Sequence, residues 1–241
     1  MNNFNLKKNF RHIKRTAFWL KKKGRSKIPS AFMRDNIIFV HVPKAAGSTI
    51  SLCLFGYRTG HRSIESFWRD DPAFTEHAFK FSFVRHPYFR FVSAYHYLLN
   101  GGMSHRDAEH SQRYPREFAS LRSFAEASEQ ADFRQSIFHL RPQWEFLSLP
   151  ANACYKVFMD YVGKTEFFNE HIDLLNLLVP EPIGARLALV KENRLNSSTP
   201  SSCGIDKYVF SKILSIYQDD FEMFGYDEYN TIEKAGQLIA P

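Results

Sequence analysis

The sequence predicts a single α/β domain in which helices flank a central parallel β-sheet. Its 241 residues suffice for one sizeable hydrophobic core and are few for two complete domains. Two strongly apolar runs, 37–40 and 79–84, each lead through a short turn into a segment whose apolar residues have helical spacing. Strands that alternate with helices favour a parallel sheet, because parallel neighbours need a long crossover connection.

The expected elements follow from local patterns along the chain. Phe91, Tyr95, Leu98 and Leu99 share one face of an expected helix, which a pair of glycines ends. Turn formers and prolines separate the later segments. In chain order we expect a strand at 37–40, a helix ending at 56, a strand at 79–84, a helix at 88–99 and a long polar loop or disordered insertion at 101–119. These are followed by a largely helical stretch at 121–140, a strand at 155–162, a helix at 166–178, a loop at 193–204 and a helix at about 205–217. The last helix is expected to bury Ile213, Leu214 and Ile216.

Basic residues are concentrated at the N-terminus. Residues 1–34 hold eleven Lys and Arg and no Asp or Glu, which leaves 21 basic and 25 acidic residues beyond them, although the formal net charge is +7. We therefore divide the chain into a basic arm (1–34), one domain (35–230) and a C-terminal tail (231–241). An anion site in the domain must be built locally, and no nucleic-acid partner is expected.

The arm carries Phe10, Ile13, Ala17 and Leu20 at near-helical spacing among lysines and arginines. Such a helix can lie on an anionic membrane surface, and a solvated basic tail is the alternative. We read no run of about 18 apolar residues and no signal peptide, so we expect a cytoplasmic protein, with the arm as a candidate for peripheral contact with the inner face of the membrane. The three cysteines are widely spaced, which does not indicate a disulfide framework or a zinc site.

The segment Pro43-Lys44-Ala45-Ala46-Gly47-Ser48-Thr49, shortly after the first strand, has the composition of a phosphate-binding turn. A strand that feeds a helix through a tight turn points the free N–H groups of the helix start at whatever lies in the turn. Small residues let an anion approach the backbone, the lysine adds a positive charge, and two hydroxyls add donors. Because Lys44 precedes Gly47 by three residues, this is not the Walker motif, in which the lysine follows the last glycine. A strand-to-helix turn with a chance lysine is the alternative.

A second strand end carries an arginine. Arg85 directly follows the run 79–84, and Ser93 lies one or two turns into the next helix, on a face that could meet the same oxygens. Ligands of open α/β sheets bind outside the carboxyl ends of the strands, so Lys44 and Arg85 should flank one cleft. That cleft would suit a ligand with two separated phosphate-like groups, whereas an Arg-x-Pro sequence by itself is more often only a turn.

The two motifs resemble those of sulfotransferases that use 3′-phosphoadenosine 5′-phosphosulfate (PAPS). Residues 43–49 look like the 5′-phosphosulfate loop, and 83–95 are similar to the 3′-phosphate motif of the carbohydrate branch, Sulfotransferase family 2, which includes heparan sulfate 2-O-, chondroitin and dermatan sulfotransferases. Segments similar to that branch follow in order at 139–143, 160–166, 195–198 and 217–226, so the resemblance spans residues 36–227. It implies a P-loop NTPase-like fold, PAPS as the donor, PAP as the product and no metal.

The resemblance also implies roles for individual residues. Lys44 would contact the phosphosulfate bridge, where it can stabilise the charge that develops on the leaving phosphate oxygen. Nucleotide binding would involve Ala45, Ala46, Gly47, Ser48 and Thr49 at the 5′-phosphate, Arg85 and Ser93 at the 3′-phosphate, and Asn196 and Ser197 in a loop over the nucleotide. For Asn196 and Ser197, capping of the following helix is the alternative.

The catalytic base is expected at His61, because segment 60–67 is similar to the one that carries the base histidine in the carbohydrate branch. A histidine with a pKa of about 6.5 can take the proton of a sugar hydroxyl. His77 and Glu65 are the alternative bases. The residues expected to contact the acceptor are Trp68, Arg141 and Gln143, although a helix-ending Arg-Pro pair also explains Arg141.

The expected activity is therefore transfer of a sulfuryl group from PAPS to a hydroxyl of a carbohydrate acceptor. A nucleotide-dependent phosphotransferase is the alternative enzyme. Two features argue against a phosphotransferase: the Walker spacing is missing, and no carboxylate is placed after a strand to hold Mg²⁺. A non-catalytic glycan- or anion-binding module on the same fold is the third hypothesis.

Overall fold

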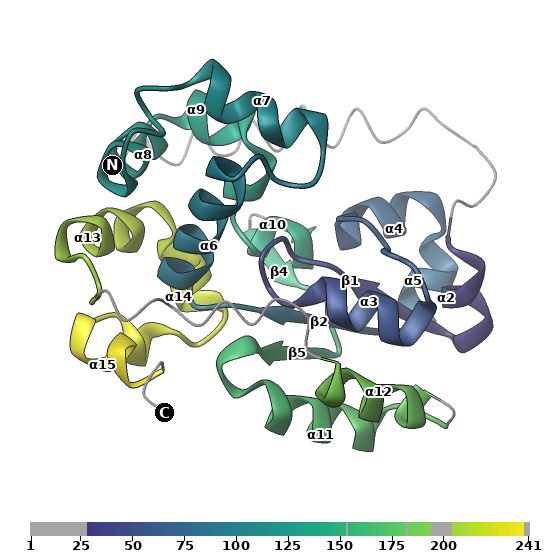
Figure 1. The fold of residues 1–241 in the computed structure, drawn as a ribbon. Coiled ribbons are helices and arrows are strands. Elements are labelled where there is room, and N and C mark those ends of the chain that lie inside the picture. The colour runs from purple at the N-terminus through teal and green to yellow at the C-terminus, as the bar shows by residue number, and fades with distance from the viewer. Residues whose placement is uncertain (1–27, 153, 182, 194–203, 239–241) are drawn as a thin grey trace.

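A sheet of three parallel strands lies at the centre of the computed structural model (Figure 1). Its strands are β1 (Ile37–Val40), β2 (Phe79–Val84) and β5 (Tyr161–Lys164), with β2 in the middle. The structure describes residues 28–152, 154–181, 183–193 and 204–238. The prediction of an α/β domain with a parallel sheet flanked by helices is confirmed.

The two apolar runs form strands that can be buried on both faces. All four residues of β1 and five of the six residues of β2 are buried. The rings of Phe39 and Phe81 pack across the two strands with their centroids 5.0 Å apart, and the Ser82 hydroxyl donates to Val40 O over 2.6 Å. Continuous apolar strands are what a parallel sheet covered by helices requires. Both runs end at the same edge of the sheet, where the two motifs begin.

Helices surround this sheet (Figure 1). They are α2 (Ser30–Asp35), α3 (Gly47–Phe55), α4 (Ile64–Asp70), α5 (Pro72–His77), α6 (Pro87–Leu99), α7 (His105–Arg113), α8 (Leu121–Glu129), α9 (Ala131–Ser136), α10 (Trp144–Leu147), α11 (Phe168–Leu178), α12 (Ile183–Glu192), α13 (Lys207–Ile216), α14 (Gln218–Met223) and α15 (Ile232–Gln237), with 3₁₀ turns η1 (Phe138–Leu140), η2 (Thr165–Phe167) and η3 (Asp227–Tyr229). α12 packs against α3 and α11, α11 packs against β5, and α6 contacts both α7 and α13. α8, α9 and η1 confirm the largely helical stretch at 121–140, and α11 confirms the helix at 166–178.

The expected third strand at 155–162 is wrong. The chain forms two short strands there, β4 (Cys154–Val157) and β5, and only β5 joins the central sheet. β4 pairs with β3 (Ser148–Ala151) in an antiparallel hairpin, where its residues are alternately exposed and half-buried. The chain leaves the hairpin and joins the central sheet at Asp160. The Asp160 carboxylate accepts from Lys80 N over 2.7 Å, and its N–H donates to Lys80 O over 2.8 Å. Alternating polarity suits a surface hairpin rather than a buried parallel strand.

Residues 101–119 are not a loop or a disordered insertion, because they contain helix α7. Ser104 and Asp107 form a capping box in which each side chain accepts from the other residue's N–H over 3.1 Å. Gly102 has a φ of +60°, and a Cβ there would lie 2.3 Å from Asp107 Cβ, so the turn before the helix requires glycine. α7 is polar on nearly all sides, which hides it from hydrophobic periodicity, whereas its capping pair is visible in the sequence.

Smaller differences concern the exposure of three residues and several helices in stretches where no element is predicted. Leu99, in the last turn of α6, is 43% exposed and does not share the buried face of Phe91, Tyr95 and Leu98. Of the three residues expected to be buried in α13, Ile213 is buried, while Leu214 and Ile216 are half-buried. Besides α7, the helices not predicted from the sequence are α2, α4, α5, α10, α12, α14 and α15, of which α12 buries apolar residues on one side.

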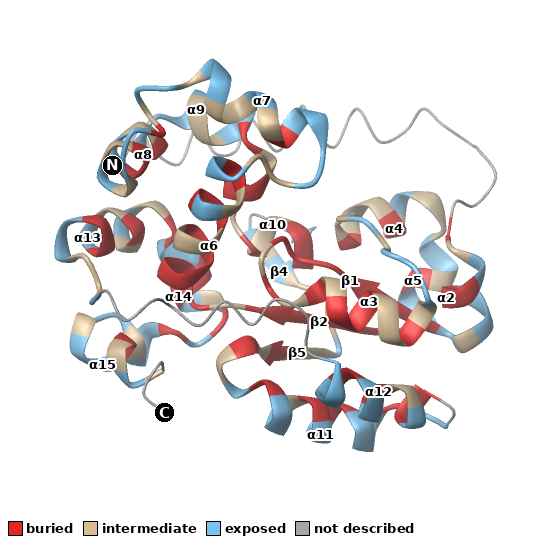
Figure 2. Cartoon of the chain, viewed as in Figure 1, coloured by how far each residue is buried: buried red, intermediate tan, exposed pale blue. Residues whose placement is uncertain are grey.

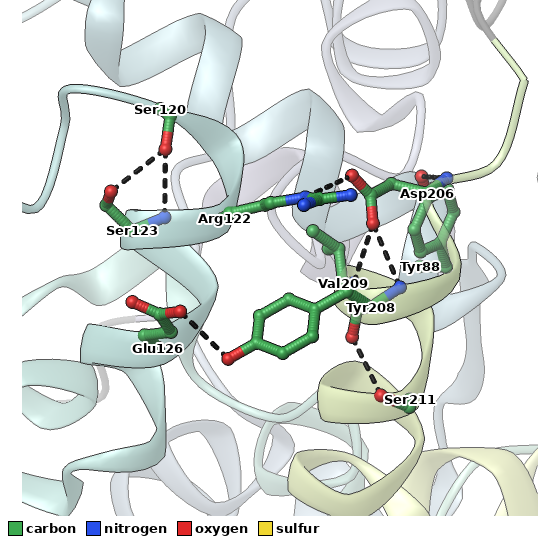
Figure 3. A network of polar contacts seen from close by, with 9 residues as sticks. All are labelled: Tyr88, Ser120, Arg122, Ser123, Glu126, Asp206, Tyr208, Val209 and Ser211. Carbon is green, nitrogen blue, oxygen red and sulfur yellow. Dashed lines mark hydrogen bonds and ion pairs between the residues drawn. The ribbon is translucent and has the colours of Figure 1, made fainter.

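A polar network holds α13 to α8 (Figure 3). The Asp206 side chain accepts from the first N–H groups of α13, including Tyr208 N over 2.9 Å, and from Arg122 Nε of α8 over 2.8 Å. The Tyr208 hydroxyl donates to Glu126 over 2.8 Å, and Asp206 N donates to the Tyr88 hydroxyl of α6 over 3.0 Å. The network confirms the helix expected at about 205–217 and fixes it against the helix that follows β2.

Figure 2 shows buried residues concentrated on the central strands and exposed residues on the outer helices. Among the described residues, no helix combines the length and the apolar character needed to cross a bilayer. Residues 1–27 of the basic arm lie outside the described residues, so contact of the arm with a membrane stays a prediction.

Candidate active site

The turn between β1 and α3 has an unusual backbone. Lys44 and Ala46 adopt the left-handed conformation, with φ of +66° and +59°. For residues with a side chain this costs roughly 1–2 kcal/mol each, and such strain is concentrated at functional sites. Gly47 then begins α3 against the His41 ring, because a Cβ at Gly47 would lie 1.9 Å from His41 Cδ2. Glycine is therefore required for the start of the helix to approach the end of β1 this closely.

The start of α3 is available to an anion. No side chain caps this nine-residue helix, whose N-cap residue, Ala46, has no polar side chain. Among the predicted residues, Ala45 and Thr49 are buried and Ser48 is half-buried. The N–H groups and the positive end of the helix dipole together favour a negatively charged group in the turn.

Lys44 and Arg85 are brought to one edge of the sheet, as the sequence predicts. They follow β1 and β2, which are parallel neighbours with Val40 opposite Ser82. Burial and the nearby Arg85 guanidinium lower the pKa of Lys44 to about 8, against the opposing charge of Asp107. Each of these two cations disfavours the charged form of the other, so an anion placed between them stabilises the charged form of both.

His61 lies beside this lysine. Its Nδ1 is 2.9 Å from the backbone oxygen of His41, and the two imidazole rings have their centroids 4.1 Å apart. A carbonyl oxygen only accepts, so the neutral His61 ring donates from Nδ1 and carries its lone pair on Nε2. Burial lowers the pKa of His61 more than the hydrogen bond to His41 and the charge of Asp107 raise it, and the charge of Lys44 lowers it further. The ring is therefore neutral at pH 7, and Nε2 can accept a proton.

Comparison with known proteins decides the family. A model of the Sulfotransferase family matches residues 32–227, which contain both anion-binding motifs and His61. The chain belongs to the sulfotransferase family. Neither a search of curated proteins nor a search of solved structures gave a match. At the level of the family, the resemblance based on residues 43–49 and 83–95 is confirmed.

Three residues that were not predicted gather around Lys44 and His61. The Lys44 ammonium lies over the Tyr97 ring, 4.0 Å from its centroid. The Tyr97 hydroxyl donates to Asp107 over 2.9 Å, and His139 Nδ1 is 3.6 Å from the same carboxylate. The His139 ring is in turn 6.2 Å from the His61 ring. The carboxylate of Asp107 therefore lies close enough for its charge to act on Lys44, His61 and His139.

Electrostatics in this cluster favour an ionised Asp107 and a neutral His139. Burial acts to raise the pKa of Asp107, but hydrogen bonds from Ser104 and Tyr97 and the charge of His139 outweigh it, so the pKa is lowered. Burial lowers the pKa of His139 to about 4, although Asp107 opposes this. The capping pair of α7 was a sequence signal for Asp107. Nothing local indicated that Tyr97 and His139 would meet it, because only the fold brings these segments together.

Gln143 and Arg141 both follow η1 but differ in their surroundings. Gln143 is fully buried, and its amide forms hydrogen bonds with the backbone of Arg85, 2.9 Å to N and 2.8 Å to O. Arg141 is partly exposed and pairs with Glu145 at 2.7 Å. Its backbone oxygen accepts from buried Arg90 over 2.9 Å.

Trp68 and His77 are not brought to the cluster. The Trp68 ring contacts the Phe158 ring edge-on at 5.4 Å, and Phe158 in turn lies 5.1 Å from the ammonium of Lys80. Lys80 is at the amino end of β2, about 16 Å of extended chain from Arg85. His77, which ends α5, is exposed at the same end of the strand.

The remaining predicted residues have less definite positions. Ser93 is half-buried in α6, the helix that follows Arg85. Asn196 and Ser197 lie outside the described residues. Within the part of the chain that the structure describes, no three His, Cys, Asp or Glu side chains are grouped as a metal ion would need.

Proposed function

We propose that this protein transfers a sulfuryl group from PAPS to a hydroxyl of a carbohydrate, with His61 as the base. The observation that carries the proposal is the grouping of Lys44, Arg85 and a neutral His61 around one strand-end edge in a chain of the sulfotransferase family. When bound, PAPS supplies the sulfuryl group on its 5′-phosphate and a second anionic group at the 3′ position. Two cationic positions at adjacent strand ends fit such a molecule.

The residues of the turn fit the 5′ end of the donor. The start of α3 has no side-chain cap, and Gly47 lets this start lie closely against the His41 ring. In the proposal the N–H groups of Gly47, Ser48 and Thr49 hold the 5′-phosphate, with Ala45 and Ala46 keeping the approach open. Arg85 and Ser93 hold the 3′-phosphate, where a planar guanidinium can bind two oxygens at once. Asn196 and Ser197 complete the nucleotide site.

Lys44 and His61 carry the chemistry in this proposal. As an acceptor hydroxyl attacks in line, negative charge develops on the bridging oxygen of the leaving phosphate, and a fixed Lys44 ammonium stabilises it there. His61 Nε2 takes the proton of the attacking hydroxyl, while the hydrogen bond from Nδ1 to His41 O keeps the ring oriented. The step assigns no role to a metal, because Lys44, Arg85 and the start of α3 supply the positive charge.

A carbohydrate acceptor is proposed from the resemblance to the carbohydrate branch, with Arg141 as the partly exposed candidate for acceptor contact. The basic arm is proposed to bring the protein to the cytoplasmic face of an anionic membrane. Sedimentation with anionic liposomes at low salt tests this, and equal sedimentation with and without residues 1–30 would contradict it.

The experiment that tests the function compares ligands and then chemistry. PAP should raise the melting temperature of the protein more than ATP with Mg²⁺ does, because only PAP carries the 3′-phosphate that Arg85 would bind. A larger shift with ATP and Mg²⁺ would favour a nucleotide-dependent phosphotransferase. Transfer of ³⁵S from labelled PAPS to a saccharide acceptor would then separate the enzyme from a glycan-binding module that only binds PAP.

A further inference from the structure

The amide of Gln143 binds one residue through both of its ends. Oε1 accepts from Arg85 N over 2.9 Å, and Nε2 donates to Arg85 O over 2.8 Å. This is the pattern by which a neighbouring strand pairs with a residue of a sheet, so the side chain extends the pairing of β2 by one residue beyond Val84. With both backbone groups bound, the direction of the Arg85 side chain from its Cα is fixed. Gln143 has no exposed surface with which to contact an acceptor.

Gln143 is itself held by a buried carboxylate. Asp220 of α14 accepts from Gln143 N and from Trp144 N, both over 2.9 Å, and has no exposed surface. The Arg90 guanidinium of α6 lies 4.0 Å from this carboxylate and is also buried. A buried charge is tolerated when it is paired and hydrogen-bonded in this way. The chain of contacts therefore runs from Asp220 through Gln143 to the backbone of Arg85.

The residue after Arg85 is held in the same manner. His86 N donates to Glu166 over 2.8 Å, and the other oxygen of that carboxylate accepts from the Tyr226 hydroxyl over 2.8 Å. His86 Nε2 lies 3.1 Å from Tyr229 O. The carboxyl end of β2 is thus bound by groups from three distant parts of the chain, and Gln143 binds the backbone of Arg85 directly.

From this geometry we infer that Gln143 is a positioning residue for Arg85 and sets the preference of the nucleotide site for a 3′-phosphate. The inference rests on the proposed function, in which Arg85 binds that phosphate. A guanidinium binds two phosphate oxygens only when its plane is held in register with them, so a loosened Arg85 backbone weakens this contact selectively. The 5′ end of the nucleotide, bound by the start of α3, does not depend on Gln143.

Gln143→Glu tests the inference, because the variant keeps the acceptor for Arg85 N but places an oxygen against Arg85 O. Isothermal titration calorimetry should measure the affinities for PAP and for AMP, which lacks the 3′-phosphate. We expect PAP to bind about tenfold more weakly than to the wild type and AMP to change by less than about twofold. Gln135→Glu, the same change at an exposed position of α9, should leave both affinities unaltered.

Gln143→Leu provides a second variant of similar size, without a buried charge, in case Gln143→Glu does not fold. It removes both hydrogen bonds and should lower the ratio of PAP to AMP affinity in the same direction. Equal weakening of PAP and AMP, or no weakening of PAP in a variant with native circular dichroism, would overturn the inference while the wild-type preference for PAP stands. A wild-type protein that binds PAP no better than AMP would overturn the proposed function as well.

Discussion

Raising the pH above 8 should weaken the binding of PAP, because Lys44 then loses its proton. Burial and the charge of Arg85 lower the pKa of Lys44 to about 8 in the free protein. A bound anion favours the charged lysine, so binding is tightest below this pKa and is lost as the pH rises through it. Between pH 7 and pH 9 the protonated fraction falls about tenfold, and the apparent dissociation constant should rise about tenfold.

The assay is isothermal titration calorimetry of PAP from pH 7 to pH 9.5 in two buffers that differ in their enthalpy of ionisation. Above pH 6 to 7 the phosphates of PAP are already dianionic, so they add little further pH dependence. Lys44→Met should bind PAP more weakly at pH 7 and show no decline toward pH 9. Lys156→Met, at an exposed position of β4, should behave like the wild type.

Two results would refute this reasoning about Lys44. The first is a PAP affinity that stays constant in the wild type from pH 7 to pH 9.5, and the second is an alkaline decline that persists in Lys44→Met. Asp107→Asn provides a further test, because the charge of Asp107 raises the pKa of Lys44. Its removal should move the alkaline decline to lower pH, and an unchanged profile would exclude this electrostatic contact.

Three further predictions concern the site and the residues that support it. His61→Ala should lower turnover about a hundredfold and leave PAP affinity within about twofold, whereas His77→Ala, at an exposed position, should change neither. Gly47→Ala should abolish PAP binding and lower the free energy of unfolding by about 1–3 kcal/mol, because its Cβ would meet the His41 ring at 1.9 Å. Gly236→Ala, in open space within α15, should not lower the free energy of unfolding measured by chemical denaturation, because alanine favours the helix. Burial lowers the pKa of His86 to about 4, so the unfolded chain takes up this proton first and stability falls between pH 6.5 and pH 4. Between pH 7 and pH 5 the wild type should lose about 2 kcal/mol more than His86→Gln in urea titrations.

Each of these predictions has a contrary outcome. A His61→Ala protein with most of its activity would remove this histidine from the role of base. A Gly47→Ala protein with normal PAP affinity would mean that the ring of His41 can move aside. Equal losses of stability with acid in the wild type and in His86→Gln would show that this histidine is not held neutral in the folded protein.

The sequence by itself determined the two strand ends and the charged residues beyond them. The runs 37–40 and 79–84 could only be buried strands, because they are apolar with little interruption, and their end points placed Lys44 and Arg85 at one edge of a parallel sheet. The family was also predictable, since residues 43–49 and 83–95 resemble two of its motifs, and the family model matches residues 32–227. These features are local, which is why they can be read without the fold.

Only the tertiary structure decided which groups surround those two residues. Tyr97, Asp107 and His139 come from α6, α7 and η1, and no local pattern shows that they meet beside Lys44. The polar segment that contains α7 looked like a loop, because its stability depends on a capping pair and one packed face rather than on hydrophobic periodicity.

The surroundings of Gln143 also could not be predicted from the sequence. In the sequence it is a polar residue after a proline and close to a suspected acceptor site, whereas in the fold it is fully buried against the backbone of Arg85. Its surroundings depend on α14, 77 residues away, where Asp220 holds it in place. The sequence predicts which groups bind charge, whereas the packing of distant segments decides which groups surround them and hold them in position.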